Sequence, residues 1–325
     1  MDKIAFLILA HKNPAQLGKL VTSLDDKRFD FFIHIDAKAK GSFEAPSLKY
    51  SERCVFLSKG ERVRTYLNDF SLVDATLALA KAARRNGRYK YCVLLTGQDY
   101  PIKSNDAIYE KLLGSYPTCW IDSYGVDEAM EKGVSWVEHV GRRRFSQRIR
   151  RRLQEITGPK LYYSRLGRPV KILARVYDLI LSRLTPAPRE RVRKAGYTYS
   201  AGSHFWMLPD AAVEHLCNCH ERAAVLNDIF RHTCAPEESW FQTALSTMEG
   251  REIPDPFGQF NTPETQMDNP ALRLIKWYED GVHTSGHPAV WNEEDYPFIA
   301  RANALFARKF EHGSPIITLI DERLR

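Results

Sequence analysis

The chain has 325 residues, with 47 Lys and Arg against 40 Asp and Glu, which gives a formal net charge of +7. Hydrophobic residues make up 44% and charged residues 27%, so disordered, collagen-like and disulfide-rich scaffolds are excluded. The sequence contains no run of 18 apolar residues, so no transmembrane helix is predicted. The six cysteines are sparse for this length, which favours reduced thiols in a cytosolic protein.

The N-terminal part of the chain alternates predicted strands and helices. Residues 3–10 (KIAFLILA) predict a buried strand and not a signal peptide, because the apolar run is short and lacks a small-residue cleavage site. Leucine and valine then recur at helical spacing over 17–24. Strands are predicted at 29–36 and 54–58, and a strong helix at 70–83.

Two further elements complete this alternation. Residues 89–97 predict a strand that ends in a glycine turn, and Ser104 is a predicted cap for a helix that ends near Gly114. Alternating strands and helices predict an α/β fold with a mainly parallel sheet flanked by helices. We expect a single domain over 1–325, with a basic helical insertion at 142–195.

Polar side chains follow three of the predicted strands, in AHKNP (10–14), HID (34–36) and TGQDYP (96–101). In parallel α/β folds, ligands bind in the crevice beyond the carboxyl ends of the strands. These three segments are therefore the first candidates for a binding site.

The positive charge is concentrated between Arg142 and Lys194, where 17 Lys and Arg and three acids give a net charge of +14. The rest of the chain carries −7. Apolar residues recur at helical spacing over 172–184, which predicts an amphipathic basic helix. Three interpretations stay open: an insert whose apolar stripe packs on the main domain, a docking surface for an anionic membrane, and a nucleic-acid surface. The last is least favoured because no recognition motif accompanies the charge.

The C-terminal half is predicted with less regular alternation. A strand is expected at 202–208, helices at 209–217 and 237–248, and another strand at 272–277. The apolar run PIITLI at 315–320 predicts a late strand.

Several common site motifs are missing. The sequence contains no GxGxxG, GxxxxGK[ST], GxSxG or Asp-x-Asp. A metal site could be assembled from Cys217, Cys219, His220, His232 and Cys234, but the spacing matches no standard zinc pattern. Buried thiols on helix faces are the favoured alternative, and no metal is expected.

Two short segments carry side chains suited to catalysis. Glu238 lies at a predicted helix start, where the helix dipole stabilises an ionised carboxylate, so it is a candidate general base or an ordinary capping acid. FARKF places Arg308 and Lys309 between aromatic residues, which suits an anion site or a surface fragment.

Eight motifs occur along nearly the whole chain, in this order: FLILAHKNPAQLGKLVTSLDD (6–26), FFIHIDAK (31–38), FSLVDATL (70–77), YCVLLTGQDYPIKS (91–104), AGSHFWML (201–208), PEESWFQTAL (236–245), LRLIKW (272–277) and ALFARKFE (304–311). Together they resemble the core-2/I-branching glycosyltransferases (glycosyltransferase family 14), which include β-1,6-N-acetylglucosaminyltransferases and peptide O-xylosyltransferases. PEESWF and LFARKFE are more similar to xylosyltransferase-like and bacterial-type members.

The resemblance implies a GT-A-like, Rossmann-like nucleotide-binding fold. It implies an inverting, metal-independent transfer of GlcNAc or xylose from a UDP-sugar to a hydroxyl of a glycan or glycoconjugate. The basic amphipathic insertion, in a bacterial-type enzyme, adds the expectation of a role in surface polysaccharide biosynthesis. The donor is a substrate and no cofactor is expected. The residues that correspond to the family's site are Glu238 as catalytic base, Ala10, His11 and Asp36 at the uridine, Asp99 beside the donor sugar, Lys309 and Arg308 at the diphosphate, and Trp206 and Trp240 on sugar faces or in the core.

The chain departs from the family pattern at two places. Residues 66–69 (YLND) stand where members often carry a Trp-Gly pair, and 285–288 (SGHP) lack an arginine, for which His287 or Arg308 could substitute. A non-catalytic membrane- or nucleic-acid-binding module on a decayed transferase fold is therefore the alternative function. Otherwise the expected partners are the donor, a glycan or lipid-linked saccharide and an anionic membrane at 142–195. The expected location is cytoplasmic, peripheral at the inner membrane face.

Overall fold

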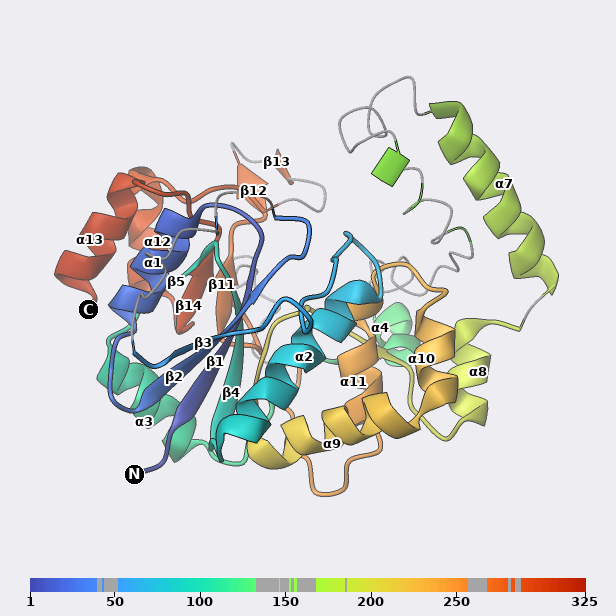
Figure 1. Cartoon of the computed structure of the whole chain (residues 1–325), viewed down its shortest axis with the longest axis horizontal. Helices are drawn as coiled ribbons and strands as arrows, with labels where there is room; N and C mark the ends of the chain where they lie inside the picture. The colour runs from blue at the N-terminus through green and yellow to red at the C-terminus, as the bar shows by residue number, and fades with distance from the viewer. Residues whose placement is uncertain are drawn as a thin grey trace.

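The computed structural model describes residues 1–39, 43, 52–132, 146, 152, 155–156, 168–184, 186–256, 268–279, 282–283 and 288–325. Its central sheet has the strand order β3-β2-β1-β4-β9-β6 (Figure 1). The strands are β1 (Ile4–Ala10), β2 (Phe29–Ile35), β3 (Cys54–Phe56), β4 (Tyr91–Thr96), β6 (Trp120–Ile121) and β9 (Trp206–Pro209). The first four are mutually parallel, and β9 runs antiparallel to β4 and β6. The prediction of a mainly parallel α/β sheet is confirmed.

Helices cover both faces of this sheet. Ala5, Leu7 and Leu9 of β1 belong to the core under α2 (Ser71–Asn86) and α9 (Asp210–Arg222). The alternate residues of β1 belong to the core under α1 (Pro14–Ser23) and α3 (Asn105–Gly114). Because a strand turns successive side chains to opposite faces, a strand covered twice is apolar throughout, as β1 is. Figure 1 shows these helix pairs on either side of the strands.

A second sheet brings distant segments together. Its order is β10 (Asp268–Asn269), β11 (Arg273–Ile275), β14 (Phe306–Arg308) and β5 (Asp99–Pro101). β11 and β14 are parallel, whereas β5 is antiparallel to β14 and places Asp99 opposite Arg308. The FARKF segment is thus a buried strand beside GQDYP and not a surface fragment.

The predicted strand at 315–320 is wrong, because this run begins helix α13 (Pro315–Arg323). Proline is favoured in the first turn of a helix, where its missing N–H is not needed. Ile316, Ile317 and Ile320 are buried against the second sheet, and their i, i+1, i+4 spacing defines one helical face. The six-residue apolar run was too short to distinguish a strand from a helix.

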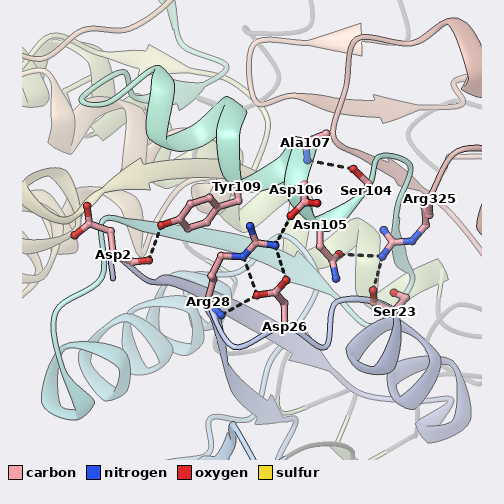
Figure 2. Close-up of polar contacts among 10 residues, drawn as sticks. All are labelled: Asp2, Ser23, Asp26, Arg28, Ser104, Asn105, Asp106, Ala107, Tyr109 and Arg325. Carbon is pink, nitrogen blue, oxygen red and sulfur yellow. Dashed lines mark hydrogen bonds and ion pairs between the residues drawn. The ribbon is translucent and has the colours of Figure 1, made fainter.

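The C-terminus is tied to the start of α3, as Figure 2 shows. Arg325 donates hydrogen bonds to the Asn105 side chain (3.0 Å) and to the Ser23 carbonyl oxygen. Beside it, the Ser104 hydroxyl accepts a hydrogen bond from the Ala107 N–H at 3.2 Å, which confirms the predicted cap.

Most of the other predicted elements are present, with changed bounds. The strand predicted at 202–208 is limited to β9, and the helix predicted at 209–217 extends to the end of α9. The helix predicted at 237–248 starts as a 3₁₀ turn, η2 (Pro236–Glu238), and continues as α11 (Trp240–Leu245). The remaining elements are β7 (Tyr124–Gly125), α4 (Val126–Glu131), α8 (Pro188–Lys194), β8 (Ser200–Ala201), α10 (Ala224–Phe230), β12 (Tyr278–Glu279), β13 (Val282–His283), η3 (Glu293–Asp295) and α12 (Tyr296–Arg301).

The predicted amphipathic helix is α7 (Arg168–Leu184), which stands apart from the central sheet in Figure 1. The apolar residues of the predicted stripe are exposed, namely Ile172, Val176, Leu179, Ile180 and Leu184, so the interpretation in which this stripe packs on the main domain does not hold. In the described part of the chain, no helix is long and apolar enough to cross a bilayer. The six cysteines all lie in described segments, and none of them forms a disulfide bond.

Candidate active site

Four chain segments meet at the carboxyl ends of β1, β2 and β4. The Asp36 N–H donates to the Ala10 carbonyl oxygen at 2.8 Å, and the Gly97 N–H donates to Leu9 at 3.0 Å. The Phe310 N–H reaches the Gln98 carbonyl oxygen at 2.9 Å and attaches the end of β14 to the same place. The three polar segments predicted from the sequence therefore lie together, with FARKF added by the second sheet.

Asp36 presents a fixed carboxylate at this edge. The side chain is buried, and it accepts hydrogen bonds from the Lys38 N–H at 2.7 Å and from the Thr65 hydroxyl. The Lys38 ammonium lies 4.0 Å from the carboxylate and 4.3 Å from the centre of the Tyr66 ring. A carboxylate fixed in this way at the strand ends is suited to accept hydrogen bonds from the polar groups of a nucleobase or a ribose.

His11 follows β1 and is surrounded by charge. Partial burial of the ring, followed by the charge of Lys12, lowers the pKa of His11 below 6.5, while Asp36 opposes this shift and Arg308 and Lys38 add to it. The imidazole is therefore neutral at pH 7 and can both donate and accept a hydrogen bond.

Asp99 is enclosed between two guanidinium groups. It is fully buried and accepts a hydrogen bond from the Thr96 N–H at 2.5 Å. Arg273 and Arg308 approach its two oxygens at 3.4 and 3.6 Å. Arg308 also donates to the Thr96 hydroxyl at 2.5 Å. Asp99 therefore has no exposed surface toward a donor sugar, and it orients Arg308 instead.

The sequence analysis did not identify Arg273. Its side chain is fully buried, and burial lowers the pKa of the guanidinium to about 10, against the opposing effect of Asp99. It donates to the Leu94 carbonyl oxygen at 2.8 Å. The guanidinium groups of Arg273 and Arg308 lie 4.7 and 5.0 Å from the centre of the Phe205 ring. The available signal was an arginine between apolar residues at the start of the predicted strand LRLIKW.

Lys309 and Lys12 add two further positive charges next to Arg308. Burial, followed by the charges of Arg308 and Lys12, lowers the pKa of the Lys309 ammonium. Within the described part of the chain, neither lysine forms an ion pair with a carboxylate. Arg308 shares its acid, Asp99, with Arg273, so the positive charges of Lys12, Lys309 and Arg308 repel one another. A bound anion would relieve that repulsion. Lys12 was not among the predicted site residues, although it follows His11 directly.

Glu238 lies at the end of η2. The turn is set by Ala235 in a left-handed conformation (φ 47°), and the Glu238 carbonyl oxygen accepts a hydrogen bond from the Gly202 N–H at 2.8 Å. Burial of the side chain, with a smaller effect from Asp122, raises the pKa of Glu238 to about 7. A carboxyl group with this pKa is suited to exchange protons at neutral pH.

Asp122 is a second carboxyl group beside Glu238 that the sequence analysis missed. It is buried, and its carboxylate accepts a hydrogen bond from the Ser203 N–H at 3.0 Å. Burial raises the pKa of Asp122 to about 7 as well. It directly follows the short strand β6, which was not among the predicted strands, so no predicted strand end pointed to it.

A four-residue segment, Gly202–Phe205, connects the carboxyl groups to the cations. Its first residue is bonded to the backbone of Glu238, and its last places an aromatic ring against Arg308. Three extended residues span at most about 11 Å, so these two anchor points are close. Gly202 is required there, because a Cβ would lie 1.7 Å from the Asp122 carbonyl oxygen.

A cavity of about 550 Å³ lies next to these residues. It is lined by Ser123 and Ser200, the chain neighbours of Asp122 and Ala201, and by Gln242, Arg251 and Asp255. The Gln242 amide donates to the Asp122 carbonyl oxygen at 3.2 Å, so one wall of the cavity is attached to the carboxyl pair.

Trp206 and Trp240 are both fully buried. Trp240 donates its ring N–H to the Asn227 side chain at 3.0 Å, and both rings pack against Phe241. The alternative of core packing therefore describes them, and neither presents a face to a sugar.

The residues considered for a metal site have other neighbours. His220 lies 3.0 Å from Asp74, and Cys219 lies 3.4 Å from His215. In the segments that the structure describes, no three His, Cys, Asp or Glu side chains are grouped to hold a metal ion.

One of the two departures from the family pattern can be described. Leu67 is exposed, and Asn68 adopts a left-handed conformation (φ 56°), which asparagine tolerates better than most residues. The next residue, Asp69, accepts a hydrogen bond from the Ser71 N–H at 2.9 Å and stabilises the start of α2. His287 lies outside the described residues.

The fold is α/β and GT-A-like, with charged side chains gathered beyond the carboxyl ends of its parallel strands. The chain belongs to the core-2/I-branching enzyme family, since the family model "Branch: Core-2/I-Branching enzyme" matches residues 4–300.

Three curated proteins are similar to part of the chain. A Danio rerio protein named beta-1,3-galactosyl-O-glycosyl-glycoprotein beta-1,6-N-acetylglucosaminyltransferase 4 is 31% identical over 113 residues, which cover 34% of this chain and 26% of that protein. A Bos taurus beta-1,3-galactosyl-O-glycosyl-glycoprotein beta-1,6-N-acetylglucosaminyltransferase has the same identity and coverage. A Mus musculus transferase 4 is 24% identical over 112 residues, covering 34% of this chain and 24% of its own. The matches thus span about a quarter of the relatives' length.

Proposed function

We propose that this protein is an inverting glycosyltransferase that moves a sugar, GlcNAc or xylose, from a UDP-sugar to a hydroxyl of a glycan or glycoconjugate. One observation carries the proposal: the short segment Gly202–Phe205 contacts both Glu238 and Arg308. Its Gly202 is hydrogen-bonded to the backbone of Glu238, whose pKa is raised to about 7, and its Phe205 ring packs against Arg308 of the cation cluster. Family membership and the names of the relatives agree with it.

In the proposed reaction, Glu238 accepts the proton of the acceptor hydroxyl as its oxygen attacks the anomeric carbon of the donor sugar. The bond from that carbon to the β-phosphate oxygen breaks, and UDP leaves with the bonding electron pair. A single displacement inverts the anomeric configuration. General-base assistance of this kind contributes typically about 10²–10⁴ in rate.

Lys309, Lys12 and Arg308 stabilise the charge that grows on the departing diphosphate. We further propose that these cations replace a divalent ion, because Arg308 and Lys12 lie close enough to lower the pKa of Lys309 and the sequence has no Asp-x-Asp. Activity should then survive excess EDTA. A rate that falls with EDTA and returns with Mn²⁺ or Mg²⁺ would argue against this part of the proposal.

We assign uridine to the strand-end site at Ala10, His11 and Asp36, where the fixed carboxylate and the neutral imidazole can form hydrogen bonds with a base or a ribose. The acceptor is assigned to the polar cavity beside Asp122. Arg251→Ala in its wall should raise the acceptor KM without changing the donor KM.

The base assignment is tested with Glu238→Gln. The amide keeps the shape of the side chain but cannot take a proton, so the variant should bind UDP with unchanged affinity and lose about 10²-fold or more in kcat. Calorimetric UDP titration and a UDP-release assay measure the two quantities. Near-normal kcat would remove Glu238 from the mechanism.

The diphosphate assignment is tested with Lys309→Ala, for which UDP affinity should fall about tenfold or more. Lys27→Ala is the matched control, since this exposed lysine precedes the amino end of β2, at the opposite edge of the sheet. Equal UDP affinity in both variants would contradict the assignment.

The acceptor class and location are also proposals. A lipid-linked saccharide or surface-polysaccharide intermediate at the cytoplasmic face of a membrane suits a transferase with a strongly basic insertion. The alternative of a non-catalytic binding module predicts a fold that UDP does not stabilise, and UDP-dependent thermal stability decides between them.

A further inference from the structure

Helix α7 is amphipathic, but its apolar face is turned to solvent. Ile172, Val176, Leu179 and Ile180 recur at i, i+4, i+7 and i+8 and so share one face, which Leu173 widens. Leu173 is 70% exposed and Ile180 54%. An apolar face of this width in water is costly, and such faces mark interaction sites.

The opposite face of α7 holds the helix in place. Ala174 is buried there, and Asp178, one turn later, accepts hydrogen bonds from the N–H and the hydroxyl of Ser146 at 2.7 and 2.8 Å. The helix is thus attached by a small and a polar residue, while its large apolar residues point outward. Amphipathic helices that pack on a core have the reverse arrangement.

Exposed cations border the apolar face. Arg168 precedes Ile172 by one turn, and Arg175 and Arg183 lie within a turn of the same stripe. The neighbouring helix α8 differs, because Arg189 and Arg191 pair there with acids at 2.5 and 2.8 Å. Arg168, Arg175 and Arg183 are exposed, and among the described residues no carboxylate forms an ion pair with them, so their charge is available to an external anion.

We propose that α7 is a docking helix that lies in the headgroup region of an anionic phospholipid bilayer, with its apolar face in the lipid and Arg168, Arg175 and Arg183 against the phosphates. An interfacial helix of this type combines apolar burial with electrostatic attraction. A second copy of the chain is a poor occupant, because two segments of net charge +14 would repel each other. Nucleic acid offers phosphates but nothing for the apolar face.

The test is flotation of the full-length protein with vesicles of phosphatidylcholine, with and without phosphatidylglycerol. The wild type should float with the anionic vesicles, and added salt should weaken binding. Leu173→Ser/Ile180→Ser should lower the partition coefficient about tenfold or more. The control Val225→Ser/Phe298→Ser removes exposed apolar residues from α10 and α12 and should bind like the wild type.

A third variant, Arg168→Gln/Arg175→Gln/Arg183→Gln, should lose the preference for anionic vesicles. The proposal is overturned if the wild type binds neither vesicle, or if Leu173→Ser/Ile180→Ser binds as well as the wild type. It is also overturned if light scattering shows a dimer that this variant dissociates. The result is independent of the proposed function, since flotation needs no donor and UDP stabilisation of the variant is measured separately.

Discussion

At the scale of single residues, the two carboxyl groups beside Gly202, those of Glu238 and Asp122, are the best indication of the chemistry. Both have a pKa raised to about 7, mainly by burial, and the charge of Asp122 adds to the shift at Glu238. A base with this pKa is half ionised near neutral pH. The rate of a reaction that needs the ionised form should rise with pH through that region.

Asp122→Asn tests this coupling. The substitution removes a negative charge that disfavours ionisation of Glu238, so the pKa of Glu238 should fall and the acid limb of the kcat/KM profile should move to lower pH. Initial rates between pH 5 and pH 9 measure it. Asp127→Asn, at an exposed position in α4, is the control and should leave the midpoint in place. A limb that stays fixed or moves upward in Asp122→Asn would contradict the coupling.

The buried acid Glu237 predicts how the stability of the fold depends on pH. Its side chain is buried, and burial, with smaller effects from Glu238 and Asp69, raises its pKa well above 4.5. The folded chain therefore holds this proton more tightly than the unfolded chain. Its contribution to stability is fully present below pH 4.5 and is lost as the pH rises toward the folded pKa, at about 1.4 kcal/mol per pKa unit.

Glu237→Gln should therefore raise Tm at pH 7.5 and leave it unchanged at pH 4, because the amide imitates the protonated acid without its ionisation penalty. Thermal unfolding at the two pH values measures the difference. Glu249→Gln, at an exposed position, should change Tm at neither pH. A lower Tm for Glu237→Gln at pH 7.5 would show that the buried acid is ionised.

At the scale of elements, the site depends on how closely the segment before β9 approaches β6. A Cβ on Gly202 would lie 1.7 Å from the Asp122 carbonyl oxygen, and the side chains cannot relieve a contact with backbone. Gly202→Ala should therefore cost about 1–3 kcal/mol or more in unfolding free energy and reduce transfer by displacing the Glu238 backbone. Denaturant unfolding and the UDP-release assay measure both effects.

Gly87→Ala is the control, because no atom lies within 4 Å of a Cβ at that position. Its cost should be near zero. Equal stability of the two variants would mean that the loop yields easily and does not constrain Glu238.

Helices and strands with their own capping or terminating residues were predicted from the sequence. Ser104 and Gly114 bound α3 because capping and helix termination depend on neighbouring residues. PIITLI contains one such signal, Pro315, which is favoured in the first turn of a helix, but its six apolar residues fit a strand as well as a helix. FARKF was ambiguous for a different reason, since its strand pairs with β5 about 200 residues earlier in the chain.

At the scale of the whole molecule, the proposed function predicts that ligand binding stabilises the fold. UDP at 100 times its Kd should add about 2.7 kcal/mol to the free energy of unfolding, because only the folded chain has the pocket. A thermal-shift titration measures it, and Lys309→Ala should need more UDP for the same shift. Uridine lacks the diphosphate and should stabilise less at equal concentration. No shift with UDP would favour the non-catalytic alternative.

The sequence by itself determined the family, the α/β class, the core strands and the identity of Glu238, Asp36, Arg308 and Lys309 as candidates, because each is written in local patterns or ordered motifs. Only the tertiary structure decided what surrounds them. In the structure, Asp99 is buried between two arginines, and both candidate tryptophans lie in the core. Asp122 and Lys12 join the candidate site residues, and the apolar face of α7 is exposed to solvent. Burial and charge environment are set by contacts between residues far apart in the chain, and no local pattern encodes them.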